Sequence, residues 1–440
     1  MRFTAFHAGD GDCILVTSSD NPPRRLLVDG GRSTSYVNNT RDFLGQIAAA
    51  HEKLDIVCVS HIDDDHITGI LRLVEDEVEW RAFEFLRTLD ASTPEPDLAR
   101  PPEIGEVWHN GLFRLVGGDL GHSVEPVLAT LATVLAGSPH ARLRDLAAQL
   151  DGLATGEKAS MELSRRLAPE QLGIALNPPS GGQLMKRETT GAIRPAEEVT
   201  RGSLRIQLLG PSQDDIDALR RKWQEWIDTH QRAVEQLHAD LLADEQRLGT
   251  LSPRIVVNPM LDQALGEGLA NVTEANLASL MLLVEENGSK ALLTGDGVSS
   301  EIIAGLERHK RLDANGRIHV NILKVQHHGA KANVEEDFVR RVTADHYVFC
   351  GNGAHDNPEI EVVEAFARAR LQGIANGAPL GPATPFKFWF TSSQASQGLT
   401  ASRKAHMKAV RDTVTSLRVG HQAKMLAATF LAEGNFEIVV

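Results

Sequence analysis

Residues 61–66 carry an unusual density of side chains that can bind a metal ion. In order they are His61, Ile62, Asp63, Asp64, Asp65 and His66. Three adjacent carboxylates repel one another unless cations lie beside them, and imidazole nitrogen is a ligand that zinc, iron and manganese accept. The alternative is a solvated acidic turn with incidental histidines. We expect a metal site here, and with it hydrolytic chemistry.

Further acidic and imidazole groups follow other strand-like segments. Asp296 ends KALLTGD, His327 and His328 end HVNILKVQHHG, and His355 follows ADHYVFCGNG. The run LDIVCVS before His61 is itself typical of a strand buried on both faces. Because the carboxyl ends of parallel strands share one edge of an α/β sheet, we expect four strands to bring these groups to one site.

The rest of the chain predicts an α/β core that is split in sequence. Strand-like runs at 12–17 and 25–29 predict a hairpin, and strands return at 203–209 and after 270. The intervening segments have helical patterns, the longest at 213–249. The predicted domains are a first core part at 1–75, a helical insertion at 76–202, a core strand at 203–212, a long-helix insertion at 213–269 and a second core part at 270–440.

Composition bounds the class of protein. The 440 residues are 42% hydrophobic and 24% charged, which is typical of a soluble globular chain. The net charge of −14 argues against nucleic-acid binding over the whole surface, although metal ions can invert the sign of an acidic cleft. No segment resembles a membrane span or a secretory signal, and the three cysteines lie apart in apolar runs. We expect a cytoplasmic protein with buried thiols.

Two other kinds of site lack support. The glycine-rich GDGDC segment does not stand between a strand and a helix, as a phosphate-binding loop would. No serine or cysteine lies beside a recognisable histidine–acid pair, so the sequence does not predict covalent catalysis.

The pattern His61-x-Asp63-x-Asp65-His66 resembles the HxHxDH signature of the metallo-β-lactamase superfamily, with aspartate at the second histidine. Together with TGD, HHG, GDGD, LLVDGG and GNGAHDNP, it is similar to the branch that includes the hydrolase-like domain of bacterial DNA-uptake channel proteins. The resemblance covers 1–75, 203–212 and 270–440. It implies an αββα four-layer metallo-β-lactamase-like sandwich with two mainly helical insertions.

The resemblance also implies ligands for two divalent ions, zinc or manganese. Position by position they are His61 and Asp63 for the first ion, Asp65 and His66 for the second, Asp296 between them, and one imidazole of His327 and His328 on the second. The family usually has a further histidine upstream of the bridging aspartate, where this chain has Asn276. That departure favours an oxygen-seeking ion such as manganese at the first site.

Four residues have open roles. Asp29 could orient a ligand or only shape a turn, and Asn276 could contact substrate or cap a turn. His355 could face the site or belong to a loop held by its neighbours. His109 stands alone in an apolar run and is expected to be structural rather than catalytic.

The expected activity is hydrolysis by a metal-bound hydroxide. Asp63, Asp65 or His328 would pass a proton to the leaving group. The substrate suggested by the resemblance is a phosphodiester in nucleic acid or a nucleotide. The alternatives are a lactone or ester hydrolase on the same fold, and a non-catalytic binding module that holds a metal ion.

The insertions suggest partners. The apolar stripe of 213–249, which includes Ile216, Leu219 and Trp223, predicts packing, a homodimer or a partner protein that gates the cleft. Basic runs at 220–222 and 308–311 could contact phosphates, or could be solvated helix faces.

Overall fold

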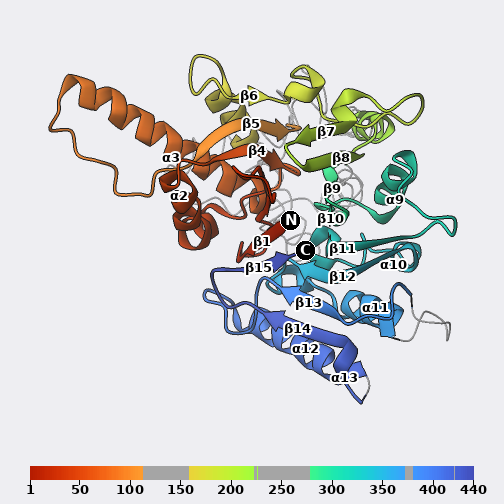
Figure 1. Ribbon diagram of the computed structural model, residues 1–440. Helices are drawn as coiled ribbons and strands as arrows, with labels where there is room; N and C mark the ends of the chain where they lie inside the picture. The colour runs from red at the N-terminus through yellow and green to blue at the C-terminus, as the bar shows by residue number, and fades with distance from the viewer. Residues whose placement is uncertain (112–157, 222–224, 226–277, 372–379, 421) are drawn as a thin grey trace, which may run out of the picture.

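The computed structural model describes residues 1–111, 158–221, 225, 278–371, 380–420 and 422–440. These residues form two β-sheets with helices around them (Figure 1). The seven-stranded sheet has the order β15-β1-β2-β3-β4-β5-β6, and the eight-stranded sheet has the order β14-β13-β12-β11-β10-β9-β8-β7. The expectation of a mixed α/β fold is confirmed.

The strands and helices have the following bounds. The seven-stranded sheet contains β1 (Arg2–Phe6), β2 (Ile14–Thr17), β3 (Arg25–Val28), β4 (Lys53–Val59), β5 (Glu103–His109), β6 (Ala175–Leu176) and β15 (Asn435–Val439). The eight-stranded sheet contains β7 (Glu198–Arg201), β8 (Leu204–Gly210), β9 (Met281–Glu286), β10 (Ser289–Leu293), β11 (Ile318–Lys324), β12 (Val342–Phe349), β13 (Phe386–Phe390) and β14 (Leu426–Phe430). The helices are α1 (Ser33–Ser35), α2 (Arg41–Ala49), α3 (Asp64–Leu89), α9 (Ser299–Arg308), α10 (Glu336–Arg341), α11 (Ile360–Leu371), α12 (Ala401–Leu417) and α13 (Gln422–Met425), with a π-helical turn η1 (Tyr36–Thr40) and 3₁₀ turns η2 (Pro178–Ser180), η3 (Pro195–Glu197), η5 (Gln326–Gly329) and η6 (Ala354–Asp356).

Each sheet buries both of its faces, because successive strand residues point in opposite directions. Val16 and Ala291 belong to a core that lies between the two sheets. Their neighbours Leu15 and Leu292 pack on the opposite faces, Leu15 in a core with α2 and α3 and Leu292 in a core with α9, α10 and α11. The result is an α/β sandwich in which helices cover the outer face of each sheet.

The two sheets each contain a run of parallel strands. In the seven-stranded sheet β3, β4, β5 and β6 are parallel neighbours. In the other sheet β10 through β14 are parallel neighbours. Parallel strands end at the same edge of their sheet, so the loops after β10, β11 and β12 share one edge, whereas the loop after β4 belongs to the other sheet. The four strands therefore do not belong to a single sheet, which corrects the expectation from the sequence.

Glycine allows the start of α3 to lie directly against the loop after β3. A Cβ atom on Gly69 would come within 2.0 Å of the Gly30 carbonyl oxygen. The backbone N–H of Gly30 donates to the His66 carbonyl at 2.9 Å, and that of Gly69 donates to the Gly31 carbonyl at 2.8 Å. The VDGG and HITG segments therefore join β3 and α3 closely enough for Asp29 to reach His66.

The predicted helical insertion at 76–202 needs correction in its described part. Helix α3 crosses the predicted boundary at residue 75, and β5, β6 and β7 belong to the two sheets. The β5 sequence EIGEVWH contains Gly105 and Glu106, which break the apolar pattern of a buried strand. Glu106 is accommodated because it accepts from Trp108 Nε1 at 2.8 Å and from Arg201 Nη2 at 2.8 Å.

Most of the second predicted insertion lies outside the described residues. Its first turns, 213–221, are helical, and Ile216 and Leu219 are buried there. Trp223 and the remainder of the apolar stripe lie beyond the described part, so the homodimer and gating hypotheses stay predictions.

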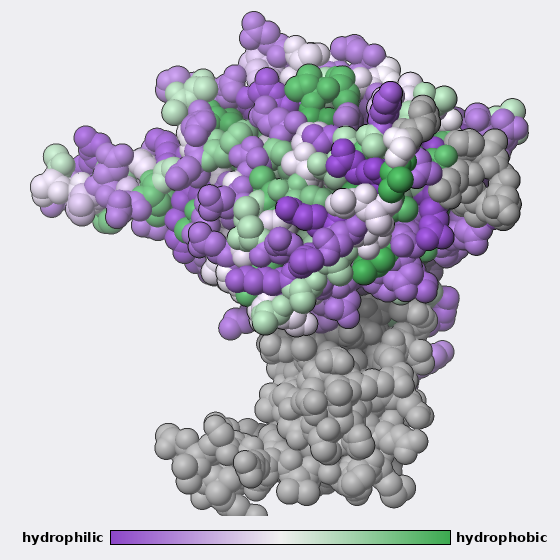
Figure 2. Space-filling model, turned by 90° about the horizontal axis from the view of Figure 1, so that it is seen from below, coloured by the Kyte–Doolittle hydropathy of each residue, from purple (hydrophilic) through white to green (hydrophobic). Residues whose placement is uncertain are grey.

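Helix α3 extends away from the sheets and forms the arm at the left of Figure 1 and Figure 2. Its end exposes Phe85, Leu86 and Leu89. None of the described helices has both the length and the apolar character that crossing a membrane requires.

Candidate metal centre

Four of the six residues at 61–66 have side chains in one cluster. They are His61, Asp63, Asp65 and His66. Strand β4 is buried up to Val59, and α3 begins at Asp64. His61 and His66 are buried, whereas Asp64 points away and pairs with the Arg32 guanidinium. The carboxylate of Asp64 is thus neutralised by an arginine outside the cluster. The carboxylates of Asp63 and Asp65 remain available to the site.

Asp296, which follows β10, lies at the centre of the cluster. Its carboxylate oxygens lie 3.4 Å from His328 Nε2, 3.5 Å from His66 Nε2, 3.6 Å from His327 Nε2 and 3.8 Å from His61 Nε2. Only 2% of Asp296 is exposed. Four imidazole rings, which follow strands of both sheets, therefore direct their Nε2 atoms at the buried carboxylate of Asp296.

Both members of the tandem histidine pair reach Asp296 because the backbone bends sharply after β11. His327 has φ 44° and His328 has φ 54°. The left-handed region is costly for residues other than glycine, and such strain gathers at functional sites. The sequence left open which imidazole would be a ligand, and the structure places His328 inside the cluster and His327, 31% exposed, at its rim.

Two imidazoles and a second carboxylate lie close to one side of Asp296. His328 Nε2 lies 3.2 Å from Asp65 Oδ2, and 3.4 Å from His66 Nε2. His66 Nε2 lies 3.9 Å from Asp65 Oδ1. Imidazole nitrogen and carboxylate oxygen are the ligands that zinc and similar divalent ions accept. The four side chains His66, His328, Asp65 and Asp296 therefore have the chemistry to hold a divalent ion.

The other side of Asp296 is more open. His61 Nε2 lies 3.4 Å from Asp63 Oδ2, and 3.8 Å from Asp296 Oδ2. His327 Nε2 lies 3.6 Å from the same Asp296 oxygen. Asp63 is the most exposed of these carboxylates, with 36% of its side chain accessible. This half-site offers two imidazoles and two carboxylates, and it faces solvent.

In three of these imidazole rings the Nδ1 atom donates a hydrogen bond to an acceptor on the side away from Asp296. The Nε2 atom of each of these rings is therefore directed at Asp296. His66 Nδ1 donates to Asp29 Oδ2 at 2.9 Å, and His328 Nδ1 donates to the Cys350 carbonyl at 2.7 Å. His327 Nδ1 donates to Asn333 Oδ1 at 2.6 Å. An acceptor on one ring nitrogen selects the tautomer whose other nitrogen can bind a metal.

Asp29 lies directly behind His66, where its carboxylate can orient that imidazole. It is fully buried and has φ 59°. The Ser60 backbone N–H donates to Asp29 Oδ1 at 2.6 Å, and the Ser60 hydroxyl donates to Asp29 Oδ2 at 2.6 Å. Both oxygens of the carboxylate are thereby fixed, and one of them also accepts from His66.

Asp12 and Lys324 complete the cluster and were not predicted from the sequence. Asp12, His66, Asp296 and His328 each offer a ligand atom within 4.8 Å of the others. However, Asp12 approaches the Nδ1 atoms of the rings, at 3.3 Å for His328 and 4.0 Å for His66. It also pairs with the buried Lys324 ammonium. We therefore assign Asp12 to orienting the imidazoles and the Nε2 side to binding an ion.

The electrostatics of the cluster favour added positive charge. Burial would lower the pKa of His66, but the carboxylates of Asp296 and Asp65 outweigh it and hold this pKa well above its usual range. Burial would also lower the pKa of His328, but the carboxylate of Asp296 outweighs burial and holds this pKa well above its usual range. Burial would raise the pKa of Asp296, yet the surrounding imidazoles hold it well below its usual range. Divalent cations are the groups that such a field attracts.

Several polar atoms at the centre are buried without a hydrogen-bond partner among the described residues. They include His61 Nε2, Asp63 Oδ1 and Asp296 Oδ1. Unsatisfied buried polar atoms are rare in folded proteins and call for an explanation such as an ion. Their position around Asp296 fits a cation bound at this cluster.

The remaining candidates lie elsewhere. His355 is exposed in η6, and among the described residues no hydrogen bond or ion pair joins it to the cluster. Asn276 lies outside the described residues. His109 is buried and its Nε2 lies 2.8 Å from the Ser160 hydroxyl, as expected for a structural histidine. Arg308, in the second basic run, pairs with Glu197 at 2.5 Å and so serves the packing of α9.

No model of a known protein family matches this chain, and no curated protein matches it either.

Replacing Asp29 with asparagine is expected to weaken metal binding roughly 10- to 100-fold, the usual effect of losing a group that orients a metal ligand. The asparagine amide could present a donor to His66 Nδ1 and so disfavour the tautomer with a free Nε2. Competition with a coloured chelator measures the affinity. An affinity equal to that of the wild type would show that Asp29 only shapes the turn.

Proposed function

We propose that this protein is a metal-dependent hydrolase that acts on phosphodiester bonds of nucleic acid or nucleotides. We also propose that its sandwich is the αββα four-layer fold of the metallo-β-lactamase superfamily. The observation that carries the proposal is the convergence of four imidazole Nε2 atoms on Asp296, at 3.4–3.8 Å. Such a carboxylate suits a position between two cations.

The residues that would hold the ions fall into two groups. His66, His328 and Asp65 lie on the buried side of Asp296, whereas His61, Asp63 and His327 lie on the open side. Divalent ions, when bound, lower the pKa of coordinated water and polarise the bond under attack. Zinc suits the imidazole-rich buried side, and zinc or manganese suits the open side.

The chain supplies the remaining functions. Asp29, the Cys350 carbonyl and Asn333 hold three imidazoles in one tautomer before substrate arrives, and such preorganisation avoids reorganisation during the reaction. Asp63 and His327 are the exposed members of the cluster, so substrate can reach them. A carboxylate or imidazole at this rim can transfer a proton to the leaving oxygen.

The substrate class rests on analogy together with charge. The sequence motifs resemble a branch linked to DNA handling, and cationic side chains lie near the cluster. Arg32 pairs with Asp10 and Asp64, and Arg403 Nη1 lies 3.8 Å from Asp10. An anionic substrate is compatible with these guanidinium groups, whereas a neutral lactone gains nothing from them.

The test is to load purified protein with zinc or manganese and to measure cleavage of bis(p-nitrophenyl) phosphate and of a single-stranded oligonucleotide. We expect both to be cleaved, and chelation with EDTA to stop the reaction. The same preparation is offered a lactone and a carboxylic ester. Hydrolysis of those substrates without phosphodiester cleavage would overturn the substrate class, and metal binding with no hydrolysis would favour the binding module.

A further inference from the structure

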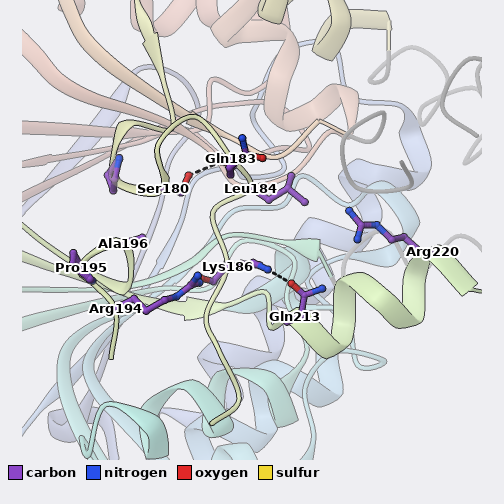
Figure 3. Close-up of a pocket in the computed structure, with 10 residues that line it drawn as sticks. Ser180, Gln183, Leu184, Lys186, Arg194, Pro195, Ala196, Gln213 and Arg220 are labelled. Atoms are coloured by element: carbon purple, nitrogen blue, oxygen red, sulfur yellow. Dashed lines mark hydrogen bonds between the residues drawn. The ribbon is translucent and has the colours of Figure 1, made fainter. Parts of the chain in front are cut away.

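A cationic pocket of about 510 Å³ lies apart from the metal centre (Figure 3). Three of its lining residues, Lys186, Arg194 and Arg220, carry positive charge. The others are polar or apolar, namely Pro179, Ser180, Gln183, Leu184, Pro195, Ala196 and Gln213. Among the described residues that line it none is acidic, although the whole chain has a net charge of −14. The pocket thus concentrates positive charge on an otherwise acidic protein.

The pocket is built from three segments that hold one another in place. Lys186 Nζ donates to Gln213 Oε1, and Arg194 Nη2 donates to the Lys186 carbonyl at 3.1 Å. The neighbouring Arg187 is buried, donates to the Leu209 carbonyl at 2.7 Å and pairs with Glu301. These contacts position the cations before a ligand arrives, which lowers the entropic cost of binding.

The charges of the pocket are only partly neutralised. Arg194 Nη1 lies 2.9 Å from Glu188, and Arg220 Nη1 lies 3.4 Å from Asp217. Lys186 makes no ion pair with any carboxylate of the described chain. The Lys186 ammonium, backed by two guanidinium groups, is therefore suited to an anionic group such as a phosphate.

The pocket lies at the same edge of the sandwich as the metal centre. Strands β8 and β10 are both antiparallel to β9, so their carboxyl ends share one edge, and Gln213 follows β8 as Asp296 follows β10. In the other sheet β4, β5 and β6 are parallel, and Ser180 follows β6 as His61 follows β4. Two strand spacings separate the members of each pair, which corresponds to roughly 10 Å along the edge.

The segment between the two sites is well anchored. The Asn177 side chain bonds the backbone of His109 in both directions at 2.8 Å, and the Asn110 side chain bonds the backbone of Met185 at 2.7 and 2.8 Å. The ends of β5 and β6 are thereby joined to Lys186. The distance between pocket and metal centre is a property of the folded core rather than of a loose loop.

We propose that this pocket is a second phosphate-binding subsite, which holds a phosphate of a single-stranded nucleic acid while the metal centre acts on another phosphodiester of the same strand. The inference rests on the proposed function, and it specifies the substrate class as a single-stranded nucleic acid. Among the described residues no aromatic side chain lines the pocket, so its described lining offers cationic contacts to phosphate rather than stacking surfaces for bases. A substrate must carry at least two phosphates to occupy both positions.

The test compares the double variant Lys186→Gln/Arg220→Gln with a control, Arg368→Gln/Lys408→Gln, which removes two exposed cations from α11 and α12. Binding of fluorescein-labelled oligodeoxythymidine is measured by anisotropy in EDTA, with circular dichroism as a check on folding. We expect the pocket variant to bind roughly tenfold more weakly. Its slope of log affinity against log salt should fall by about 0.7, corresponding to one phosphate that is no longer neutralised.

Turnover provides a second readout that separates this proposal from the first. In the metal-loaded protein, the KM for a long oligonucleotide should rise in the pocket variant relative to the KM for a dinucleotide, which carries one internal phosphate. If the wild type cleaves no phosphodiester, the proposed function fails while the anisotropy experiment still decides the pocket. If the pocket variant and the control bind the oligonucleotide equally, the pocket is no phosphate subsite and this inference is overturned.

Discussion

Replacing Asp296 with asparagine is expected to lower kcat for phosphodiester cleavage by about 10³-fold or more, the scale on which a lost transition-state interaction is felt. All four imidazole Nε2 atoms approach this one carboxylate, at 3.4–3.8 Å. An amide has the same size but no charge, so both halves of the site lose their shared anionic ligand. Metal content, measured by emission spectroscopy on the purified variant, should fall along with kcat.

Asp64→Asn is the matched control for this change. Asp64 belongs to the same acidic run as Asp63 and Asp65, but its carboxylate pairs with Arg32 outside the cluster. We expect Asp64→Asn to retain the metal content of the wild type. Equal metal content in wild type, Asp64→Asn and Asp296→Asn would contradict the central position of Asp296.

The sequence predicted the positions of the site strands because those strands are buried on both faces. Strands β4, β10 and β11 each end in a buried, largely apolar stretch, which favours a strand inside a sheet. Their following polar residues, His61, Asp296 and His327, could therefore be assigned to strand ends from the sequence, although β4 belongs to a different sheet from β10 and β11.

Other parts of the site depended on contacts that no local pattern encodes. The consecutive left-handed residues His327 and His328 are what bring both rings to Asp296, and propensities would have predicted neither. Strand β5 was missed because its buried Glu106 is neutralised by Arg201, which is distant in the chain. Tertiary partners made a polar residue acceptable in a sheet, as Asp12 also did for Lys324 in β11.

Lys324 did leave a signal in the sequence. It stands near the end of the otherwise apolar run ILKVQ, directly before the histidine pair. A charged residue in a doubly buried strand requires a buried partner, because an unpaired charge is costly there. The GDGDC segment supplies that partner in Asp12.

Replacing Lys324 with methionine is expected to lower the free energy of unfolding by about 3–5 kcal/mol, the cost of removing one partner from a buried ion pair. Lys324 is 1% exposed and Asp12 is 1% exposed. Burial opposes the charge on Lys324, but Asp12 and Asp296 outweigh it and raise the pKa of this ammonium above its ordinary value. The pair is therefore charged, and the methionine variant leaves the Asp12 carboxylate buried without its ammonium. Denaturation in urea measures the loss.

The double variant Asp12→Asn/Lys324→Met should recover much of that stability, since it removes both charges together. Lys408→Met serves as the matched control, because Lys408 pairs with Asp412 on the exposed face of α12, where such pairs contribute about 0.5 kcal/mol or less. If Lys324→Met were no more destabilising than Lys408→Met, the pair would not hold the cluster together. If the double variant recovers its stability but binds metal more weakly, the role of Asp12 and Lys324 is to orient the imidazoles of His66 and His328 rather than to stabilise the fold.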